Sequence, residues 1–528
     1  MTGVRDRANP VAGSFKPYRW SASIDAVAER YGIAPETVLK FDQNTPPQPG
    51  VPQIPLAQSM ARLNEYPDGS YRALREAAAS YVDLTADHVV VGAGADDLIL
   101  LLAHVFLRRG TRAAIDPPTY ALYRIVTALR DAELVGLDDD ADLDWICNPQ
   151  NPTGACLEPE AIVERARRRP ETVVVVDEAY VEFGARTCAP WVDELENLVV
   201  VRTMSKAFGF ASLRVGYALA HPETAALLTE RRAPAPISGP AADIAAAALR
   251  EPRLGEVETT IGERERLRAA LTEAGYTCGP SIGNFVAVLT DKPLADRLEE
   301  QGIVVRAFDG GIRITLRRPS ENDLLLRALG ASPGPAPGRE ATLVRTTTET
   351  ALRLTLTLDG TGRSRVETGI GYLDHLLTLL SFHAGFDLEL AAAGDLDVDD
   401  HHTVEDVHAA LGAALAQALG TREGVARYGS AVVPMDESRA TAAVDLVRRP
   451  HAEIELAFAS DRVGSLAVTL LRHALERFAI EAGCTVHVEA RGADDHHLAE
   501  AAYKALGQAL RQAVAPGDDG IRSTKGAA

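Results

Sequence analysis

The residues best suited to chemistry stand in a repeated motif. Asp399-Asp400-His401-His402-Thr403-Val404-Glu405 returns 95 residues later as Asp494-Asp495-His496-His497-Leu498-Ala499-Glu500. Residues three or four apart share one face of a helix, so the histidines and the glutamate of each copy can bind one cation. The spacing is that of metal ligands, and it occurs twice.

Two further histidines extend the repeat. His375 and His473 each lie in an apolar stretch that predicts a helix, and each is followed at the same distance by Ala-Gly and a predicted strand. Each half supplies three histidines and one glutamate, which together are too many ligands for one ion. We therefore predict two metal sites that share ligands from both halves. Cysteine is absent from the set, which disfavours structural zinc and suits manganese or a similar octahedral ion.

The alternative is that the two His pairs are only solvated, acidic helix starts. A single copy of the motif would leave that alternative ahead, because short motifs often occur by chance. The recurrence with its flanking residues, and the location of 10 of the 13 histidines after Gly338, favour the metal sites. The histidines that do not repeat are expected to be ordinary surface or core residues: His383, His408, His451 and His487.

A second pair of candidate residues follows two apolar runs in the first 330 residues. Asp177 comes directly after Val173–Val176, and Lys206 follows Leu198–Val201. Alone, the aspartate would be read as a helix cap and the lysine as a snorkelling side chain. Together they suit pyridoxal phosphate, because a lysine can form a Schiff base while an aspartate keeps a pyridine nitrogen protonated.

A glycine turn supplies a site for the cofactor's phosphate. Gly92-Ala93-Gly94-Ala95-Asp96-Asp97 follows a predicted strand and opens a helix, whose free N–H groups can bind an anion. Ser205 and Arg214 can add a hydroxyl and a guanidinium. A dinucleotide site is disfavoured, because Asp97 stands where the third glycine would be required. Tyr120 can stack on the cofactor ring, with a plain core position as its alternative.

The surrounding elements predict an α/β fold. Four short apolar runs alternate with helical stretches, as in strands buried on both faces, and the carboxyl ends of such strands gather the chemistry: 89–91, 113–115, 173–176 and 198–201. A Pro/Gly-rich segment at 331–340 predicts a linker between domains 1–330 and 341–528. After it, residues 351–358 alternate as a half-buried strand that turns at Asp359-Gly360.

Composition limits the possible partners. The 528 residues carry a net charge of −20, which argues against nucleic acid or an anionic membrane and leaves room for basic pockets that bind phosphorylated metabolites. The five cysteines form neither a disulfide framework nor a zinc pattern, so a cytoplasmic location is expected. The longest apolar stretch, Leu98 to Leu107, is too short to span a bilayer and predicts a buried helix.

The first part of the chain resembles fold-type I aminotransferases of the histidinol-phosphate aminotransferase group. The resemblance covers about residues 15 to 330 and rests on four segments: Asn148-Pro149-Gln150-Asn151-Pro152-Thr153-Gly154, Asp177-Glu178-Ala179-Tyr180, Ser205-Lys206-Ala207-Phe208-Gly209 and Leu213-Arg214-Val215-Gly216-Tyr217. It implies a pyridoxal phosphate enzyme with a large and a small domain. The family's Asn-Glu-Asn-Pro is Asn44-Thr45-Pro46-Pro47 here, which leaves the substrate less secure than the cofactor.

The aminotransferase resemblance also implies roles for individual residues. Lys206 attaches the cofactor and moves the proton, Asp177 holds the pyridine nitrogen, and Asn151 and Tyr180 bond the phenolic oxygen. The groups implied for the cofactor's phosphate are Ser205, Arg214 and the amides of Ala95 and Asp96. The implied partners of the substrate's anionic group are Arg306 and Arg313.

The second part resembles imidazoleglycerol-phosphate dehydratase, an α+β fold of two similar halves. The matching segments are Arg345 to Thr350, Thr368 to His375, Gly394 to Asp406, Pro434-Met435-Asp436-Glu437 and Ser523-Thr524-Lys525-Gly526. The resemblance implies two manganese ions, with sites completed between subunits, held by His375, His401, His402, Glu405, His473, His496, His497 and Glu500. It implies Glu349 as the acid/base. The implied substrate-phosphate ligands are Arg427, Arg449, Lys504, Ser523 and Lys525.

Three positions depart from the dehydratase pattern and put phosphate contacts or rate in question. The family's Ser-Gly before Arg449 is Val447-Arg448, its Gln after His375 is Leu379, and its Asn before the second His pair is Asp494. Thr357 stands where a phosphatase would need its nucleophilic aspartate, so Asp359-Gly360-Thr361 is assigned no phosphatase.

Together the two resemblances imply a bifunctional enzyme of histidine biosynthesis. The dehydratase product, imidazole-acetol phosphate, would be the substrate that the aminotransferase converts with glutamate into histidinol phosphate. Two alternatives stay open: the first part is instead a phosphothreonine decarboxylase, or the second is a non-catalytic, metal-holding assembly scaffold. The resemblances imply a dimeric first part and a trimer-based second part, and no nucleic-acid or membrane partner.

Overall fold

The computed structural model describes residues 18, 20–47, 50, 52, 54, 60–61, 63–333, 338–464 and 466–517. The described chain forms two compact units. The first contains residues up to 22, 40–318 and 322–333, and the second contains residues 23–39, 319–321 and the chain from 338 onward. No helix within these ranges is long and apolar enough to cross a membrane.

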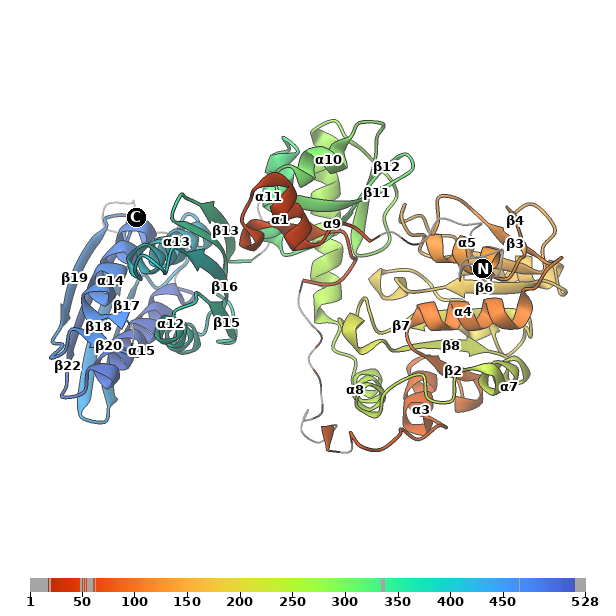
Figure 1. The fold of residues 1–528 in the computed structure, drawn as a ribbon, viewed down its shortest axis with the longest axis horizontal. Helices are drawn as coiled ribbons and strands as arrows, with labels where there is room; N and C mark the ends of the chain where they lie inside the picture. The colour runs from red at the N-terminus through yellow and green to blue at the C-terminus, as the bar shows by residue number, and fades with distance from the viewer. Residues whose placement is uncertain are drawn as a thin grey trace, which may run out of the picture. The chain divides into compact units, whose positions relative to one another are not determined.

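The first unit is built on a seven-stranded sheet (Figure 1). Its strand order is β2 (Val89–Gly92), β8 (Gly216–Ala220), β7 (Leu198–Thr203), β6 (Val173–Asp177), β5 (Leu143–Cys147), β3 (Arg112–Ile115) and β4 (Glu133–Gly136). Strands β7 to β4 run parallel, and β8 is antiparallel to both of its neighbours. All four predicted apolar runs are strands of this sheet, which confirms the α/β prediction.

Both faces of this sheet are buried, as the continuous apolar runs predict. Val174, Val176 and Val200 belong to one hydrophobic cluster, whereas Val175 and Val199 belong to another on the opposite face. The surrounding helices are α3 (Arg72–Tyr81), α4 (Ala95–Phe106), α5 (Ala121–Leu129), α6 (Pro159–Arg168), α7 (Pro222–Arg231) and α8 (Gly239–Arg250). Helix α4 contains most of the apolar stretch predicted to be a buried helix, although Leu100 is exposed.

A five-stranded sheet completes the first unit. Its order is β1 (Leu39–Phe41), β11 (Ile303–Phe308), β12 (Gly311–Thr315), β10 (Phe285–Leu289) and β9 (Thr277–Cys278). The helices of this part of the chain are α9 (Gly255–Glu273), α10 (Leu294–Glu299) and α11 (Pro319–Ala328). Segments from the beginning and the end of the first 330 residues therefore meet in one sheet.

The second unit repeats one topology twice. Its two four-stranded sheets have the orders β13-β14-β16-β15 and β17-β18-β22-β19, with one parallel pair at the equivalent edge of each. The first half comprises β13 (Glu340–Thr346), β14 (Thr350–Thr357), β15 (Ser364–Glu367), α12 (Gly371–Ala384), β16 (Asp387–Gly394) and α13 (His401–Leu419). The second comprises β17 (Tyr428–Met435), β18 (Ser438–Asp445), β19 (His451–Leu456), α14 (Val468–Ala482), β22 (Thr485–Arg491) and α15 (Asp495–Val514), with the short pair β20 (Arg462–Val463) and β21 (Leu466–Ala467).

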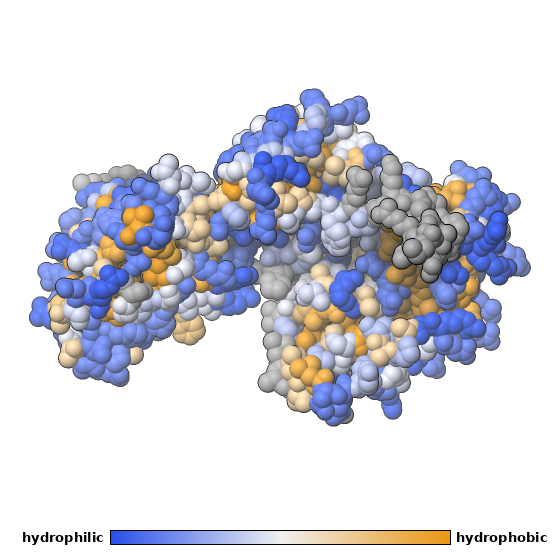
Figure 2. Space-filling view, in the orientation of Figure 1, coloured by the Kyte–Doolittle hydropathy of each residue, from blue (hydrophilic) through white to orange (hydrophobic). Residues whose placement is uncertain are grey.

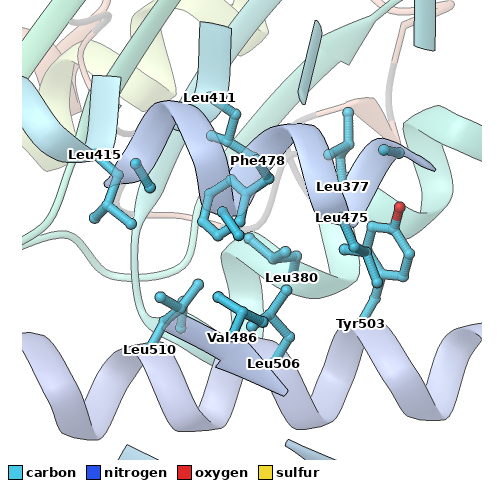
Figure 3. Close-up of a cluster of buried hydrophobic side chains, with 14 of the residues drawn as sticks. Leu377, Leu380, Leu411, Leu415, Leu475, Phe478, Val486, Tyr503, Leu506 and Leu510 are labelled. Atoms are coloured by element: carbon cyan, nitrogen blue, oxygen red, sulfur yellow. The ribbon is translucent and has the colours of Figure 1, made fainter. Parts of the chain in front are cut away.

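One hydrophobic core joins the two halves. Figure 3 shows its centre, where side chains of α12, α13, α14 and α15 interlock. The repeated Ala-Leu-Gly motif places a glycine where two helices touch. A Cβ atom on Gly412 would lie 2.4 Å from Phe478 O, and one on Gly507 would lie 2.7 Å from Leu380 O. Each glycine thus permits close packing, of α13 on α14 and of α15 on α12.

Strand β14 differs from the expectation of a half-buried strand. Leu352 and Leu354 face the core, but Ala351 and Thr355 on the other face are also buried. Within this unit, Arg353 Nη1 donates to Val38 O at 3.4 Å, and Ser320 bonds Thr342 of the neighbouring strand at 2.6 Å. Chain segments distant in sequence therefore cover the face that the alternation predicted to be exposed. Elsewhere, hydrophilic residues predominate on the visible face of both units, with hydrophobic residues in separate patches (Figure 2).

Candidate functional site

The predicted lysine and aspartate lie at one edge of the seven-stranded sheet. Asp177 is the last residue of β6, and Lys206 follows the end of the neighbouring parallel strand β7. Since parallel strands end at the same edge, the topology brings the two side chains to one site, as the two apolar runs predicted. The charge of each shifts the pKa of the other toward its ionised form.

Asp177 is a buried carboxylate held by two donors. Tyr123 Oη donates to its Oδ2 at 2.7 Å, and the Ala179 amide donates to its Oδ1 at 3.1 Å. Burial raises the pKa of Asp177 to about 6, against the opposing effect of these two hydrogen bonds. A carboxylate has about four acceptor positions, so it can still receive a proton donor such as a ring N–H.

The Lys206 amine loses its proton more readily than the amine of an ordinary lysine. Burial and the neighbouring Arg313 lower the pKa of its amine to about 8. Its Nζ donates to the carbonyl of Gln43 at 3.2 Å and lies 5.7 Å from the centre of the Tyr180 ring. A lysine in this state supplies neutral amine near neutral pH, which a nucleophile or a proton carrier requires.

Tyr180 and Asn151 are oriented by neighbours that occupy their acceptors. Asn44 Nδ2 donates to Tyr180 Oη at 3.0 Å, and Arg313 Nη1 donates to Asn151 Oδ1 at 2.6 Å. Arginine can only donate, so the amide oxygen of Asn151 must face it. Among the described residues, no acceptor is seen for the Tyr180 hydroxyl hydrogen or the Asn151 amide hydrogens. These donors suit a phenolic oxygen, and this donor set fits pyridoxal phosphate.

The glycine turn forms a cradle at the start of α4. Gly94 has φ +84°, and a Cβ atom there would lie 2.7 Å from Arg214 Nη2. A Cβ atom on Gly216 would lie 2.6 Å from the carbonyl carbon of Gly94 and 2.8 Å from Ala95 N. These glycines let Arg214 and strand β8 approach the first amides of α4 closely, and such a helix start is a type of site that binds phosphate groups.

The other predicted phosphate ligands surround this cradle. Arg214 Nη2 donates to Asp96 Oδ2 at 3.1 Å, and Tyr120 Oη donates to Asp96 Oδ1 at 3.0 Å. Ser205 is buried, and its Oγ accepts from Thr203 Oγ1 at 3.0 Å. The carboxylate of Asp96 thus holds the arginine and the tyrosine at the start of α4.

The two candidate substrate arginines lie on adjacent strands of the five-stranded sheet. Arg306 and Arg313 are Cα partners in β11 and β12. Arg306 lies over the Tyr18 ring at 5.3 Å and donates to Ser21 Oγ at 3.4 Å, whereas buried Arg313 donates to Asp42 O at 2.5 Å. Of the two arginines, only Arg313 bonds the candidate cofactor ligand Asn151 among the described contacts. Arg306 instead contacts Tyr18 and Ser21.

In the second unit, six of the eight predicted metal ligands form two groups. His375, His496 and Glu500 make one group, and His401, His473 and Glu405 make the other, with ligand atoms within 4.8 Å of one another in each. Glu500 Oε1 lies 2.6 Å from His375 Nε2 and 3.1 Å from His496 Nε2. Glu405 Oε2 lies 3.2 Å from His473 Nε2 and 3.4 Å from His401 Nε2.

Each group contains residues from both halves of the repeat. Helix α12 of the first half contributes His375 to the ligands on α15, and helix α14 of the second half contributes His473 to the ligands on α13. Sharing of ligands between the halves is what the residue count predicted. Two imidazoles and a carboxylate are ligands for a divalent first-row transition ion, which supports the fit of a metal here.

The two carboxylates have different cationic neighbours. Lys504 Nζ donates to Glu500 Oε2 at 2.8 Å, and Arg477 Nε lies 3.1 Å from Glu405 Oε1. Although burial opposes it, bonding to Lys504 and His375 lowers the pKa of Glu500 to about 2. Arg477 stands four residues after His473, and Leu379 holds the equivalent place after His375. The departure at Leu379 thus removes a polar partner from the first group.

His402 and His497 lie outside the two groups, and each faces other carboxylates. His402 Nδ1 lies 3.0 Å from Asp395 Oδ2 and its Nε2 lies 3.7 Å from Glu349 Oε1. His497 Nδ1 lies 3.1 Å from Glu437 Oε1. A carboxylate on Nδ1 leaves Nε2 as the nitrogen free for a ligand bond. The proposed acid/base Glu349 therefore adjoins a candidate metal ligand.

The predicted phosphate-binding residues of the second unit are only partly described. Arg427 forms a two-point ion pair with Asp445, at 2.7 and 3.0 Å, and Arg449 is exposed. Ser523 and Lys525 lie outside the described residues. Of the departures, Asp494 caps α15 by accepting from the amides of His496 and His497, a role that aspartate and asparagine fill equally well.

Several residues of both sites had no contact or role predicted from the sequence, although some lie in the segments that carry the resemblances. Tyr123 lies on α5, three residues after the N-cap Tyr120, and nothing in the motif indicates its contact with Asp177. Asn44 reaches Tyr180 from 136 positions away. Asp395 and Glu437, which hold His402 and His497, precede the helical motifs and do not repeat in the sequence.

Two family models match the chain. Residues 36–329 match "Aminotransferase class I and II", and residues 368–510 match "Imidazoleglycerol-phosphate dehydratase". A histidinol-phosphate aminotransferase from Sinorhizobium meliloti, solved in complex with pyridoxal-5'-phosphate, superposes with a TM-score of 0.56 at 25% identity, covering 61% of this chain and 96% of that one. An aspartate aminotransferase variant from Thermus thermophilus shares the fold, with a TM-score of 0.52 at 20% identity, covering 62% of this chain and 98% of that one.

The second unit has relatives of high identity. Imidazoleglycerol-phosphate dehydratase of Granulibacter bethesdensis is 48% identical over 193 residues, which cover 36% of this chain and 98% of that protein. That of Phytophthora nicotianae is 50% identical over 190 residues, covering 36% of this chain but only 42% of the longer protein. The chain therefore belongs to two families: its residues 36–329 to the class I and II aminotransferases, and its C-terminal part to the imidazoleglycerol-phosphate dehydratases.

Proposed function

We propose that the chain catalyses two successive steps of histidine biosynthesis. The second unit dehydrates imidazoleglycerol phosphate to imidazole-acetol phosphate, and the first unit transaminates that product with glutamate to histidinol phosphate. The observation that carries the proposal is the joint presence of the Lys206–Asp177 site and the two crossed histidine–glutamate groups in one chain. The likeness to proteins named for these two activities supports it.

In the first unit we assign each polar group to one part of the cofactor. Pyridoxal phosphate, when bound, supplies an electron-accepting ring. Asp177 would face the ring nitrogen, Tyr180 and Asn151 would donate to the phenolic oxygen, and Lys206 Nζ would carry the covalent attachment and then the proton. The start of α4 would hold the phosphate through the amides of Ala95 and Asp96, together with Ser205 and Arg214, and Tyr120 would stack on the cofactor ring.

Arg306 and Arg313 are the proposed substrate-binding residues of this unit. Both are cations on one small sheet, so they suit the phosphate of the second unit's product or the carboxylates of glutamate. Arg313, which also contacts Asn151, would place the anionic group beside the cofactor's phenolic oxygen. Substrate binding and ring orientation would then be coupled through one side chain.

In the second unit we assign the two groups to a pair of divalent ions, manganese or a similar metal. A bound ion supplies a positive charge that holds the imidazole ring and favours loss of the neighbouring hydroxyl. Glu349 would move the proton, close to His402. His402 and His497 would complete the sites of neighbouring subunits, while Arg427, Arg449 and Lys504, with Ser523 and Lys525, would bind the substrate phosphate.

We further propose that domains 1–330 and 341–528 act in a cytoplasmic homo-oligomer with no nucleic-acid or membrane partner. Dimer contacts of the first domain and trimer contacts of the second would both be used. Closed symmetric assemblies of these two kinds place different surfaces in contact, so one chain can contribute to both.

A coupled assay tests the proposal. The full chain, with manganese and pyridoxal phosphate, receives imidazoleglycerol phosphate and glutamate, and 2-oxoglutarate and histidinol phosphate are measured. Lys206→Ala should stop the second product but let imidazole-acetol phosphate accumulate, whereas Glu349→Gln should stop both. Two variants serve as controls: Lys292→Ala, at an exposed position, and Glu476→Gln, at a partly buried position whose carboxylate pairs with Arg472.

The two alternatives give different results in this assay and in a parallel reaction supplied with phosphothreonine. Release of carbon dioxide from phosphothreonine, without transamination, would identify the first unit as a decarboxylase. Bound metal without turnover, unaffected by Glu349→Gln, would identify the second unit as a scaffold. Formation of both products in sequence excludes these readings.

A further inference from the structure

Tyr123 makes the strongest contact to Asp177, yet it carries no assigned role. Its side chain is fully buried, and its hydroxyl donates to Asp177 Oδ2 at 2.7 Å. The other donor is the Ala179 amide on Oδ1. Each carboxylate oxygen therefore has one protein donor, which fixes the plane of the carboxylate and leaves a further acceptor position on each oxygen for a ligand donor.

The neighbours of Tyr123 fix the position of its hydroxyl. The ring stacks on Trp145 of β5 with centroids 5.3 Å apart and planes 6° apart, and Tyr120 packs edge-on at 5.7 Å. Trp145 is itself fixed, because its Nε1 donates to Thr127 Oγ1 at 3.3 Å. Thr127, Trp145 and Tyr123 thus form a rigid support behind the carboxylate.

We propose that Tyr123 is a positioning residue that keeps Asp177 ionised and directed at the ring nitrogen of a bound pyridine cofactor. The inference rests on the pyridoxal phosphate chemistry proposed for this site. A buried carboxylate favours its neutral form, and a neutral Asp177 could not hold a protonated ring nitrogen by charge. A hydroxyl donor to the carboxylate opposes that tendency, because it bonds the charged form more strongly.

The charged groups around Asp177 act in opposite directions, so a neutral hydrogen-bond donor is needed to keep its carboxylate ionised. Asp96 raises the pKa of Asp177, whereas Lys206 lowers it. Cys147, Tyr120 and Tyr180 also face the carboxylate and would repel it only if ionised, and the pKa of Tyr120, Tyr180 and Cys147 is raised, chiefly by burial. Attachment of a carbonyl cofactor would consume the free amine of Lys206, so that amine could no longer act on Asp177 as an ordinary ammonium group. The Tyr123 bond does not depend on that change.

The variant Tyr123→Phe tests the proposal, because it removes one hydroxyl and keeps the ring that stacks on Trp145. Pyridoxal phosphate is titrated into the cofactor-free full chain between about pH 5 and pH 9, and affinity and the absorbance of the bound cofactor are followed. We expect affinity at neutral pH to fall about tenfold or more. The pH below which affinity declines should move upward by about one unit, because Asp177 protonates more readily.

Tyr71→Phe is the matched control. Tyr71 is a buried tyrosine of the same unit whose hydroxyl donates to Ile237 O at 2.5 Å, far in sequence from Asp177. If both variants unfold at lower temperature but neither moves the pH midpoint, Tyr123 is only structural and the proposal is wrong. A midpoint shift in Tyr123→Phe alone supports it.

A double variant separates positioning from packing. In an Asp177→Asn background the carboxylate that Tyr123 bonds is absent, so adding Tyr123→Phe should not change the pH profile any further. An equal loss in both backgrounds would overturn the proposal. If the unaltered chain binds no pyridoxal phosphate, the aminotransferase assignment fails and this inference fails with it. If the unaltered chain and the Tyr123→Phe variant both bind the cofactor normally, only this inference is refuted.

Discussion

Attachment of pyridoxal phosphate to Lys206 should accelerate as the pH rises toward about 8 and then level off. The neutral amine is the attacking form, so the rate follows the fraction of Lys206 that has lost its proton. Burial, together with the positive charge of Arg313, lowers the pKa of this amine from 10.5 to about 8. A change of pH alone is therefore enough to test this prediction.

The size of the effect follows from that shift. A pKa of about 8 in place of 10.5 raises the ratio of neutral to charged amine about 300-fold at any pH. At about pH 7, roughly one amine in ten is neutral, against about one in three thousand for an ordinary lysine. Solvent reaches part of the Lys206 side chain, and its screening makes these figures upper limits.

The assay is a stopped-flow measurement of cofactor attachment to the cofactor-free chain, followed by absorbance at a series of pH values. The rate should rise about tenfold per pH unit below the midpoint. Arg313→Met should move the midpoint upward, because it removes a cation that disfavours protonated Lys206. Arg167→Met, which alters an exposed arginine paired with Glu194, should leave it in place.

Two results would refute this reasoning. A rate that still rises tenfold per unit above about pH 10 would mean that Lys206 titrates like a lysine in water. An unchanged midpoint in Arg313→Met would mean that its charge does not reach the amine.

Three further predictions concern metal binding, packing and the phosphate cradle. Glu500→Gln should weaken manganese binding at least tenfold by calorimetry, because the ligand joining His375 and His496 loses its charge, whereas Glu476→Gln, which alters a carboxylate paired with Arg472 on α14, should not. Phe478→Ala should lower the unfolding free energy of the second unit by about 3–5 kcal/mol in guanidinium titrations, since Phe478 is buried where α13 meets α14; a loss below about 1 kcal/mol would contradict this packing. Gly216→Ala should reduce pyridoxal phosphate affinity in equilibrium titrations, because the added methyl group would lie 2.6 Å from Gly94; affinity equal to that of the unaltered chain would show that the cradle does not hold the phosphate.

Much of the fold was predictable because its signals are local. Four strands of the seven-stranded sheet are continuous apolar runs, so β2, β3, β6 and β7 could be located from the sequence. The helices α13 and α15 begin at the two His motifs, and both Ala-Gly pairs after His375 and His473 end a helix before a strand. The ligand count of the repeat predicted sharing between halves, which the two groups display.

What could not be predicted depends on contacts distant in sequence. Thr355 on β14 is buried by segments more than 30 positions away in the sequence. The alternation of residue types within a strand does not predict which other segments will cover its polar face. Asn44 reaches Tyr180, and Asp395 reaches His402, through loops whose course no periodicity fixes. Side-chain partners of this kind follow from tertiary packing, so the sequence indicated the central residues and not the residues that orient them.

The crossed arrangement of the histidine–glutamate groups bears on the ancestry of the second unit. One half alone would contribute a histidine from its first helix to one group and a histidine–glutamate pair from its second helix to the other. Two identical copies related by a two-fold axis would complete both groups at once, so this arrangement is the one expected if a half-length ancestor had acted as a homodimer. After a fusion, the surroundings of each group would be free to change separately, and the two groups do differ, with Lys504 beside Glu500 and Arg477 beside Glu405.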